Sequence, residues 1–436
     1  MASKKNKTSF WKTLLISLVA LVIGVGLGFV LSESFLSYKV NFHLLGDEEQ
    51  SVMIETPYKD AGFVCVVDGV NLQDKVVVTY YDINGNEISG ITTTTLTSYV
   101  VKYTLKTENI STSITRIVNI VQFEDLEIHF MMLGNKYNGD SVYIKAGDTD
   151  ILVDAGSRAS SATAIVSYLD QHVTDDKLEY VIATHADQDH IAAFPNIFKE
   201  YAVDTVIDFP LTGKIKKPTE VYTNYRNAVN DLKEKGTKHY TALECYNNEN
   251  GAQRVIELAA GIELEILYNL YYEEESSDEN EYSVCFMLRR DDDSFLFTGD
   301  LEKYGEEYLV KKNELEEVFL FKAAHHGSKT SNTMTLLNVI KPKVVVCSCT
   351  AFYNEYKANP ENVFPTAQAI KNFVAAGVEH FYVTSMVSDN KEGYEAANGN
   401  IVIYANNSSD TPYVECSNSN EDFYNFDIFK ANRIWA

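Results

Sequence analysis

Three apolar, strand-like runs in the second half of the chain end in side chains that can bind a metal ion. The first, Tyr180 to Thr184, is followed by four such side chains within six positions: His185, Asp187, Asp189 and His190. A turn at the carboxyl end of a buried strand can direct such a cluster into one crevice, so the pattern favours an α/β fold. A polar loop is the alternative, but the cluster leads directly into an apolar helix start at Ile191-Ala192-Ala193-Phe194.

The two later runs also place side chains that can bind a metal ion at the end of an apolar strand. Phe295 to Thr298 leads into Gly299-Asp300, and Val318 to Ala324 leads into His325 and His326. Either one alone would be a weak signal, because a strand that ends in Gly-Asp is most often followed by an ordinary turn. Together with the first run they predict a metal site of imidazoles and carboxylates at neighbouring strand ends.

At these residues the sequence resembles the metallo-β-lactamase superfamily, and most closely the soluble hydrolase domain of ComEC-type competence proteins. The resemblance implies an αββα sandwich, two divalent metal ions and a bridging hydroxide that attacks the substrate. It runs from about Leu126 to about Tyr404. The motifs that carry it are Asp154-Ala155-Gly156, His185-x-Asp187-x-Asp189-His190, Asn280-x-x-Ser283, Gly299-Asp300 and His325-His326-Gly327-Ser328-Lys329-Thr330-Ser331.

The resemblance also implies a set of roles. His185, Asp187 and one of the pair His325/His326 would hold one metal, Asp189, His190 and the other histidine would hold the second, and Asp300 would bridge them. The candidate catalytic residues are Asp189, His326 and Lys329, the last as a contact for a substrate phosphate. Zinc is the first expectation for the metal, and the carboxylates make manganese the alternative.

The sequence also departs from the family. Between His190 and Asp300 the only histidine is His239, which stands in a polar stretch and is interpreted as a surface residue. Lactonases and β-lactamases place a third metal-binding histidine in this interval. ComEC-type domains carry a histidine before a proline late in the domain, where this chain has Phe364-Pro365. A substrate contact is therefore expected to be missing.

Other candidates are weaker. His129 is interpreted as a packed or edge histidine, and His43, His172 and His380 have no local partner pattern. The loop Lys214-Ile215-Lys216-Lys217 is either solvated or guides a phosphate toward the site. The acidic stretch Glu273 to Glu281 is expected to be a solvated loop rather than a cation-binding tract.

The segment Leu14 to Leu31 carries no charge over 18 residues. As a helix it would span roughly 27 Å, close to the thickness of a bilayer's hydrocarbon core. Four lysines precede it, so the positive-inside rule predicts a single-pass anchor with the N-terminus in the cytoplasm and the catalytic domain outside the cell. A cleaved signal peptide, ending at Ser32-Glu33-Ser34, is the alternative.

From residue 40 to 122, short β-branched and aromatic runs alternate with turn signals such as Asn84-Gly85, which predicts a small β-sandwich. The stretch is similar to the immunoglobulin-like repeats of bacterial surface proteins and is expected to be a passive spacer. The predicted organisation is a cytoplasmic N-terminus (1–12), a transmembrane anchor (13–35), the immunoglobulin-like domain (40–122) and the hydrolase domain (126–436).

Charge limits the partners. The net charge is −25, and residues 1–35 contribute four lysines and one glutamate, a net +3, so the remainder carries −28. Such a chain has no broad basic surface for nucleic acid. The expected substrate is a phosphodiester outside the cell, in nucleic acid or in an envelope polymer such as a choline-decorated teichoic acid. A lactonase or another esterase, and a non-catalytic surface scaffold, are the alternatives.

Six cysteines without C-x-x-C spacing suggest neither a disulfide scaffold nor a zinc ribbon. Cys347 and Cys349 lie two apart in a strand-like run, so they are expected to be buried on one face of that strand.

Overall fold

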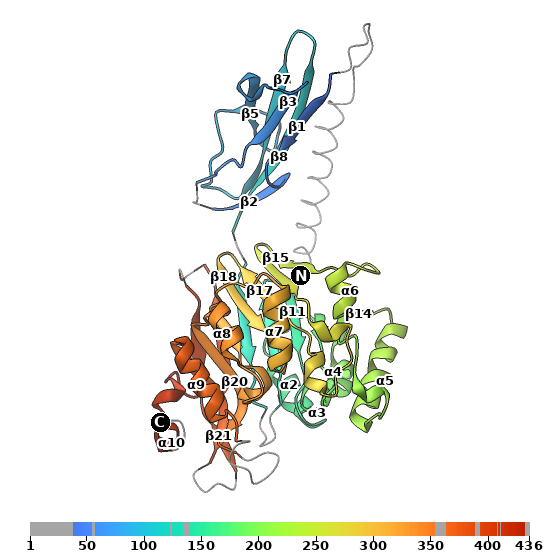
Figure 1. The fold of residues 1–436 in the computed structure, drawn as a ribbon, viewed down its shortest axis with the longest axis vertical. Coiled ribbons are helices and arrows are strands. Elements are labelled where there is room, and N and C mark those ends of the chain that lie inside the picture. The colour runs from blue at the N-terminus through green and yellow to red at the C-terminus, as the bar shows by residue number, and fades with distance from the viewer. Residues whose placement is uncertain are drawn as a thin grey trace. The chain divides into compact units, whose positions relative to one another are not determined.

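The structure is a computed structural model that describes residues 38–54, 57–122, 124–133, 139–353, 363–388, 393–407, 409 and 411–431. The chain divides into two compact units between residues 122 and 123 (Figure 1). The predicted cytoplasmic segment 1–12 and the predicted anchor 13–35 lie outside the described residues. Within those residues, every helix is too short or too polar to cross a bilayer.

The first unit is built from two β-sheets, with one 3-10 turn, η1 (Gln73–Lys75). Its core consists of alternate side chains of two long paired strands, including Tyr99, Val101 and Val118. The Asn84-Gly85 turn links two antiparallel strands as predicted, and Gly85 supplies a positive φ of 81°. One sheet has the order β1 (Val40–Leu44), β3 (Phe63–Val67), β4 (Val70–Asn71). The other has the order β2 (Glu49–Met53), β8 (Ser111–Val121), β7 (Thr97–Lys106), β5 (Val76–Tyr81), β6 (Glu87–Ile88). The immunoglobulin-like character of this unit stays a prediction.

The second unit contains two mixed sheets of eight strands each. The first has the order β14 (Lys238–Thr241), β13 (Ala202–Asp208), β12 (Lys177–Ile182), β11 (Thr149–Val153), β10 (Val142–Ala146), β9 (Leu126–Phe130), β23 (Ile401–Ala405), β24 (Tyr413–Cys416). The second has the order β15 (Val255–Ala259), β16 (Ile262–Ile266), β17 (Phe286–Arg290), β18 (Asp293–Phe297), β19 (Leu320–Lys322), β20 (Val344–Ala351), β21 (His380–Val387), β22 (Tyr394–Ala396). Strands β11 to β14 are parallel, and so are β18 to β21.

The two sheets pack face to face and helices cover both outer faces, so the layers follow the predicted order αββα (Figure 1). Between the sheets, the ring of Phe130 stacks on that of Phe297 with 6.2 Å between centroids. The apolar faces of the helices complete the two cores. The helices are α2 (Ser161–Leu169), α3 (Gln188–Ile191), α4 (Phe194–Glu200), α5 (Glu220–Glu234) and α6 (Ala242–Asn247) with the first sheet, and α7 (Lys303–Lys312), α8 (Met334–Ile340), α9 (Ala367–Ala376) and α10 (Asp427–Ala431) with the second.

Cys347 and Cys349 are both buried against the helices of the second sheet, as expected from their spacing. The acidic stretch Glu273 to Glu281, in contrast, is not fully solvated. It ends in the 3-10 turn η4 (Glu279–Tyr282), where Asn280 and Glu281 are buried. The amide of Asn269 donates to the Glu281 carbonyl at 2.7 Å, and this bond draws the end of the loop inward.

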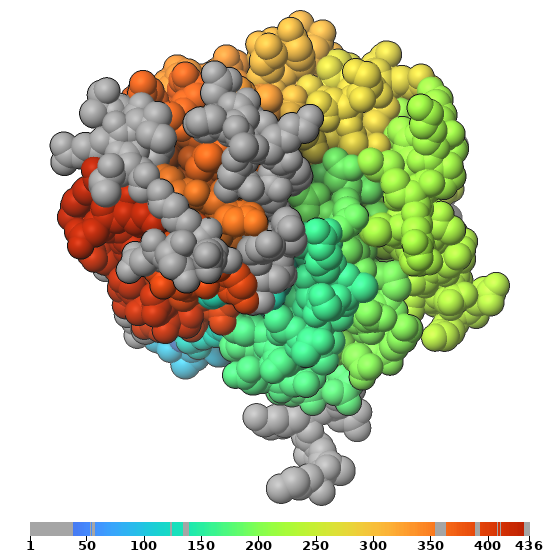
Figure 2. All heavy atoms as spheres, turned by 90° about the horizontal axis from the view of Figure 1, so that it is seen from below, coloured from blue at the N-terminus to red at the C-terminus, as the bar shows by residue number. Residues whose placement is uncertain are grey.

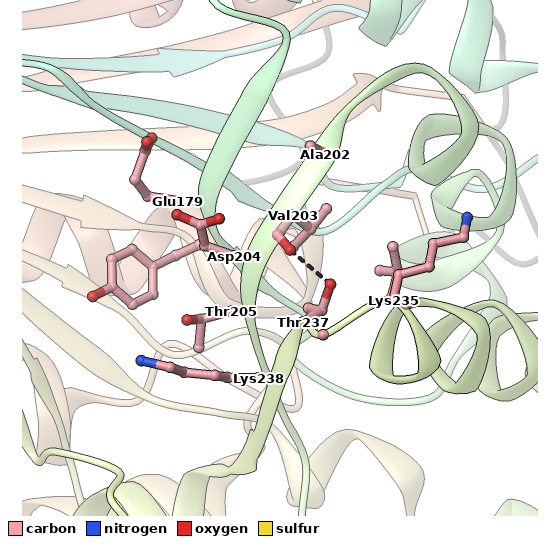
Figure 3. A pocket seen from close by; sticks show the side chains of 11 residues that line it. Glu179, Ala202, Val203, Asp204, Thr205, Lys235, Thr237 and Lys238 are labelled. Carbon is pink, nitrogen blue, oxygen red and sulfur yellow. Dashed lines mark hydrogen bonds between the residues drawn. The ribbon is translucent and has the colours of Figure 1, made fainter.

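A cavity of about 570 Å³ opens where β13 and β14 begin, lined by charged side chains that include Glu179, Asp204 and Lys238 (Figure 3). The hydroxyl of Thr237 donates to the Val203 carbonyl at 2.7 Å beside it. The sequence-predicted donors follow the opposite, carboxyl ends of the parallel strands. This cavity is therefore not part of the predicted site.

Candidate metal centre

Four buried side chains converge at one end of the second unit: Asp140, His190, Asp300 and His326. Each offers one ligand atom, and these atoms all lie within 4.8 Å of one another. His190 Nε2 is 3.2 Å from Asp300 Oδ2, and His326 Nε2 is 3.4 Å from the same oxygen. We call these four residues the inner cluster.

The inner cluster is assembled from separate loops. Asp140 precedes β10, His190 lies in α3, and Asp300 and His326 follow β18 and β19. Figure 2 shows the end of the unit at which α3 lies in Figure 1, where the teal and green surface of the earlier elements borders the orange surface of the later ones. Since the parallel strands of each sheet end on this side, donors far apart in sequence meet there.

Two further predicted donors lie against the inner cluster. Asp189 Oδ2 is 3.3 Å from His326 Nε2, and the rings of His185 and His190 are 4.0 Å apart between centroids. His185 is fully buried, and its Nε2 lies 3.9 Å from Asp187 Oδ2. Five of the predicted metal ligands are thus brought together: His185, Asp189, His190, Asp300 and His326.

The other predicted residues are turned toward different partners. Asp187 forms an ion pair with Lys214 at 2.6 Å, so this lysine neutralises a predicted ligand in the structure. His325 Nδ1 lies 3.4 Å from Glu302 Oε1 and 3.2 Å from the Thr330 hydroxyl. Lys329 is exposed at the surface rather than buried among the donors. We call Asp187 and His325 the outer donors.

Hydrogen bonds from the second nitrogen orient the two central imidazoles. His190 Nδ1 donates to Asp154 Oδ2 at 2.8 Å, and His326 Nδ1 donates to the Ser348 carbonyl at 2.8 Å. Asp154 is itself held by the backbone N–H and the hydroxyl of Thr184, both at 2.8 Å. An imidazole that donates from Nδ1 in this way can present an Nε2 lone pair to a metal.

The electrostatics of the inner cluster suit a cation. Burial alone would lower the pKa of His190, but the carboxylates of Asp300 and Asp154 raise it well above its usual range. Burial and Asp300 oppose each other in the same way at His326, whose pKa is raised to about 10. At His185 burial dominates and, with the neighbouring His190, lowers the pKa to about 4. The negative charge of the carboxylates therefore favours a bound cation in this buried centre.

Unpartnered buried atoms test whether the residues fit a metal. Among the described residues, neither His185 Nε2 nor Asp300 Oδ1 has a hydrogen-bonding partner, although both are buried. Buried polar atoms without a partner are rare because desolvation is then uncompensated. Imidazole nitrogens and carboxylate oxygens are the donors that zinc and manganese use in proteins. The donor set therefore fits a divalent metal.

Sequence reasoning missed two residues of the centre, Asp140 and Lys322. Lys322 is 3% exposed, forms an ion pair with Asp140, and has its Nζ 3.9 Å from Asp300 Oδ1. Burial opposes its charge, but Asp140 and Asp300 raise the pKa of Lys322 above its ordinary value. A lysine at the end of the apolar run Val318 to Phe321 was the available sequence signal, because a buried lysine needs an anionic partner.

Asp140 is held through its backbone against the segment 185–190, which we call the metal loop. Its N–H donates to the Asp189 carbonyl at 3.1 Å. The preceding Gly139 has a φ of 97°, and a Cβ at this position would lie 2.3 Å from the Asp189 carbonyl oxygen. Glycine is therefore required where these two segments cross.

The interpretation of His239 as a surface residue is wrong. Its side chain is 10% exposed, and its Nε2 lies 2.9 Å from Oδ1 of the buried Asp208. The parallel pairing of β14 with β13 brings the two side chains together, although the local sequence is polar. Phe364 stands before Pro365, at the position where ComEC-type domains carry a histidine. Its ring centroid lies 5.9 Å from that of His325 and 6.2 Å from that of His326.

Comparison with known proteins agrees with this geometry. The model of the Metallo-beta-lactamase superfamily matches residues 134–228 and 278–351. "Competence protein ComA" of Neisseria gonorrhoeae is 26% identical over 228 residues, which are 52% of this chain and 27% of the relative. "ComE operon protein 3" of Bacillus subtilis is 25% identical over 175 residues, 39% of this chain and 20% of the relative. The chain thus spans about a quarter of the length of these curated relatives.

Among solved structures, the metallo hydrolase Igni18 of Ignicoccus hospitalis is similar with 14% identity and a TM-score of 0.36, over 59% of this chain and 94% of that one. The family match covers the loops that carry Asp140, His190 and Asp300 and the histidine pair. The second unit of the chain is accordingly a domain of the metallo-β-lactamase fold, with relatives among competence proteins of the ComA and ComEC type.

Proposed function

We propose that the protein is a membrane-anchored, outward-facing hydrolase that holds two divalent metal ions and cleaves a phosphodiester. The observation that carries this proposal is the convergence of five predicted ligands in a centre where the buried atoms His185 Nε2 and Asp300 Oδ1 have no hydrogen-bonding partner among the described residues. A scaffold that only binds another molecule has no need for such a set of buried donors.

The residues divide the work of holding the ions. His190, His326, Asp189 and Asp300 would bind at the inner cluster, and His185 with the outer donors would complete a second position. When bound, divalent ions there would supply Lewis-acid chemistry and activate water at neutral pH. Hydrogen bonding to His326 lowers the pKa of Asp189 against the effect of burial, so this carboxylate stays ionised as a ligand must.

Lys322 and Asp140 have a supporting role. Their ion pair lies beside Asp300, where the ammonium group offsets part of the negative charge of the carboxylates. The Asp154 carboxylate keeps the Nδ1 proton on His190 and thereby directs Nε2 into the centre.

A cavity beside the metal loop supports a phosphate-containing substrate. It has a volume of about 520 Å³, and its polar lining contains one carboxylate, Asp231, beside the cationic and amide side chains of Arg158, Lys199, Gln188, Asn196 and Asn227. Cationic and amide side chains of this kind suit phosphate and hydroxyl groups. The competence-protein relatives favour nucleic acid, whereas the net charge of −25 suits a cell-envelope phosphodiester equally well.

The anchor is proposed from the uncharged segment Leu14 to Leu31 and the lysines that precede it. The first unit would then act as a spacer that holds the hydrolase away from the membrane.

Metal content and turnover of the purified full-length protein test the proposal. We expect at least two zinc or manganese ions per chain by elemental analysis, together with hydrolysis of bis(p-nitrophenyl) phosphate that Asp189→Ala abolishes. Single-stranded DNA, a teichoic acid and a lactone, assayed in parallel, would identify the substrate class. A folded, metal-free protein would contradict the proposal and favour the scaffold, and lactone cleavage without phosphodiesterase activity would favour the other esterase class.

A further inference from the structure

A second group of possible metal ligands lies outside the centre described above, on β9 and just after α2. It consists of Glu127, His129 and His172. Each offers one ligand atom, and the three atoms lie within 4.8 Å of one another. From this geometry we infer a separate zinc-binding site, made of two imidazoles and one carboxylate, which does not depend on the proposed hydrolytic function.

The donor distances match zinc. His129 Nε2 lies 3.0 Å from Glu127 Oε2. Two donors that are each about 2.0 Å from one tetrahedral ion lie roughly 3.3 Å apart, so a small adjustment would allow both to bind it. The ring centroid of His172 lies 4.8 Å from that of His129.

The surroundings hold the two imidazoles in place. His129 is 1% exposed, and its Nδ1 lies 2.8 Å from the hydroxyl of Tyr168. This contact resembles the outer hydrogen bond that metal-bound histidines make through their second nitrogen, and it leaves Nε2 to face Glu127. The ring of His172 packs against those of Tyr168 and Tyr143, at 4.7 Å and 5.7 Å between centroids.

The site is open enough to load. The side chain of Glu127 is 31% exposed and His172 is partly exposed, so an ion can enter from solvent and retain a water molecule as its fourth ligand. The cross-strand neighbour of Glu127 on β10 is Lys145, whose ammonium group pairs with Asp150 at 3.1 Å. That pairing leaves the Glu127 carboxylate directed at His129.

Zinc at this position would join the strand β9 to the turn that follows α2. The first residue of α2, Ser161, packs against Gly156, where a Cβ would lie 3.0 Å from the Ser161 Cβ. Gly156 belongs to the loop of Asp154, which orients His190. The inferred ion would therefore stabilise the packing of β9 and α2 next to the loop of Asp154, without contacting the proposed hydrolytic centre.

The test compares tightly bound zinc in full-length variants after chelation, reloading and gel filtration. We expect His172→Ala to retain one zinc fewer per chain than the wild type and to lose part of the rise in melting temperature that zinc causes. Glu127→Gln, a milder change, should weaken this binding at least tenfold. His380→Ala is the matched control, because His380 is an exposed histidine whose Nδ1 pairs with Asp422 at 2.8 Å.

Cobalt gives an independent readout. The difference between the visible spectra of cobalt-loaded wild type and His172→Ala should contain the bands of one four-coordinate ion. That difference should persist in an Asp300→Ala background, which separates this site from the proposed hydrolytic one. If His172→Ala and Glu127→Gln retain as much zinc as His380→Ala, the inference is wrong, whatever the result for Asp300→Ala.

Discussion

The inner cluster and the outer donors differ in how firmly the fold holds them. His190 and His326 are buried and oriented through their second nitrogens by Asp154 and by the Ser348 carbonyl. Asp187 and His325 are partly exposed and already paired with Lys214 and Glu302. In the proposed two-metal centre, one metal position would then be preorganised, whereas the other would form only when its ligands exchange their present partners. We therefore expect the two ions to bind with unequal affinity.

Asp300→Ala should have the largest effect. The carboxylate contacts both inner histidines, so its loss removes a ligand and leaves the imidazoles with less negative charge nearby. Replacing residues that merely support ligands costs about 10–100-fold in metal affinity or activity, so loss of this ligand should cost at least about 100-fold. Elemental analysis and phosphodiester turnover, measured on the same preparation, check it. Full metal content in the variant would remove Asp300 from the ligand set.

His325→Ala should affect only the weaker ion. We expect the tightly bound metal to remain and turnover to fall by roughly tenfold, the lower end of the range for disturbed metal sites. Metal titration followed by turnover at increasing zinc concentration separates loss of one ion from loss of both. If His325→Ala and His326→Ala lose metal equally, the two positions are equivalent and the comparison fails.

Much of this centre was predictable because its information is local. His185, His190, Asp300 and His326 each follow an apolar strand, and parallel strands bring their carboxyl ends to one edge. Asp140 was not predictable in this way, because it precedes a strand and reaches the centre only through the crossing of its backbone with that of Asp189. The sequence also could not tell which of His325 and His326 belongs to the inner cluster, because their positions depend on two consecutive left-handed backbone conformations, with φ of 48° and 52°.

The fold was predictable to a similar extent. The donor-bearing strand ends indicated an α/β fold, and the predicted runs Tyr180 to Thr184 and Phe295 to Thr298 overlap β12 and β18. His239 was misread because polar neighbours say nothing of a partner on an adjacent strand. Asp208 approaches it only through the parallel pairing of β13 with β14.

The buried end of the acidic stretch Glu273 to Glu281 offers a pH-dependent test of the surroundings of the outer donors. Burial, with Glu302 nearby, raises the pKa of Glu281 to about 7 from the ordinary 4.5. A carboxyl group with a raised folded-state pKa stabilises fully below pH 4.5 and loses that contribution as the pH rises through 7. The side chain of Glu281→Gln stays neutral at every pH. The difference in unfolding free energy between this variant and the wild type should therefore shift in favour of the variant by about 2 kcal/mol from pH 5 to pH 8. Denaturant unfolding at both pH values checks this, with the exposed Glu249→Gln as the flat control.

His239→Ala should have the smallest effect of the four. It leaves Asp208 with the Arg226 guanidinium at 2.7 Å and the Tyr225 hydroxyl at 3.1 Å, so we expect a stability loss of about 1 kcal/mol. Metal content and turnover should match the wild type. Loss of one metal ion in this variant, comparable to that in Asp300→Ala, would instead identify His239 as the third histidine of lactonases and β-lactamases, and would weaken the case for a phosphodiester substrate.

Gly139 shows that a residue with no metal-binding chemistry can govern the spacing of ligands. Its missing side chain lets two loops touch, and the hydrogen bond from Asp140 to the Asp189 carbonyl then ties a carboxylate from each loop into one rigid piece. The separation of the two segments that carry those carboxylates is consequently fixed by a backbone contact. Adding a single methyl group at this position would displace two donors at once, so a genetic screen for inactive variants should recover Gly139 alongside the ligands themselves.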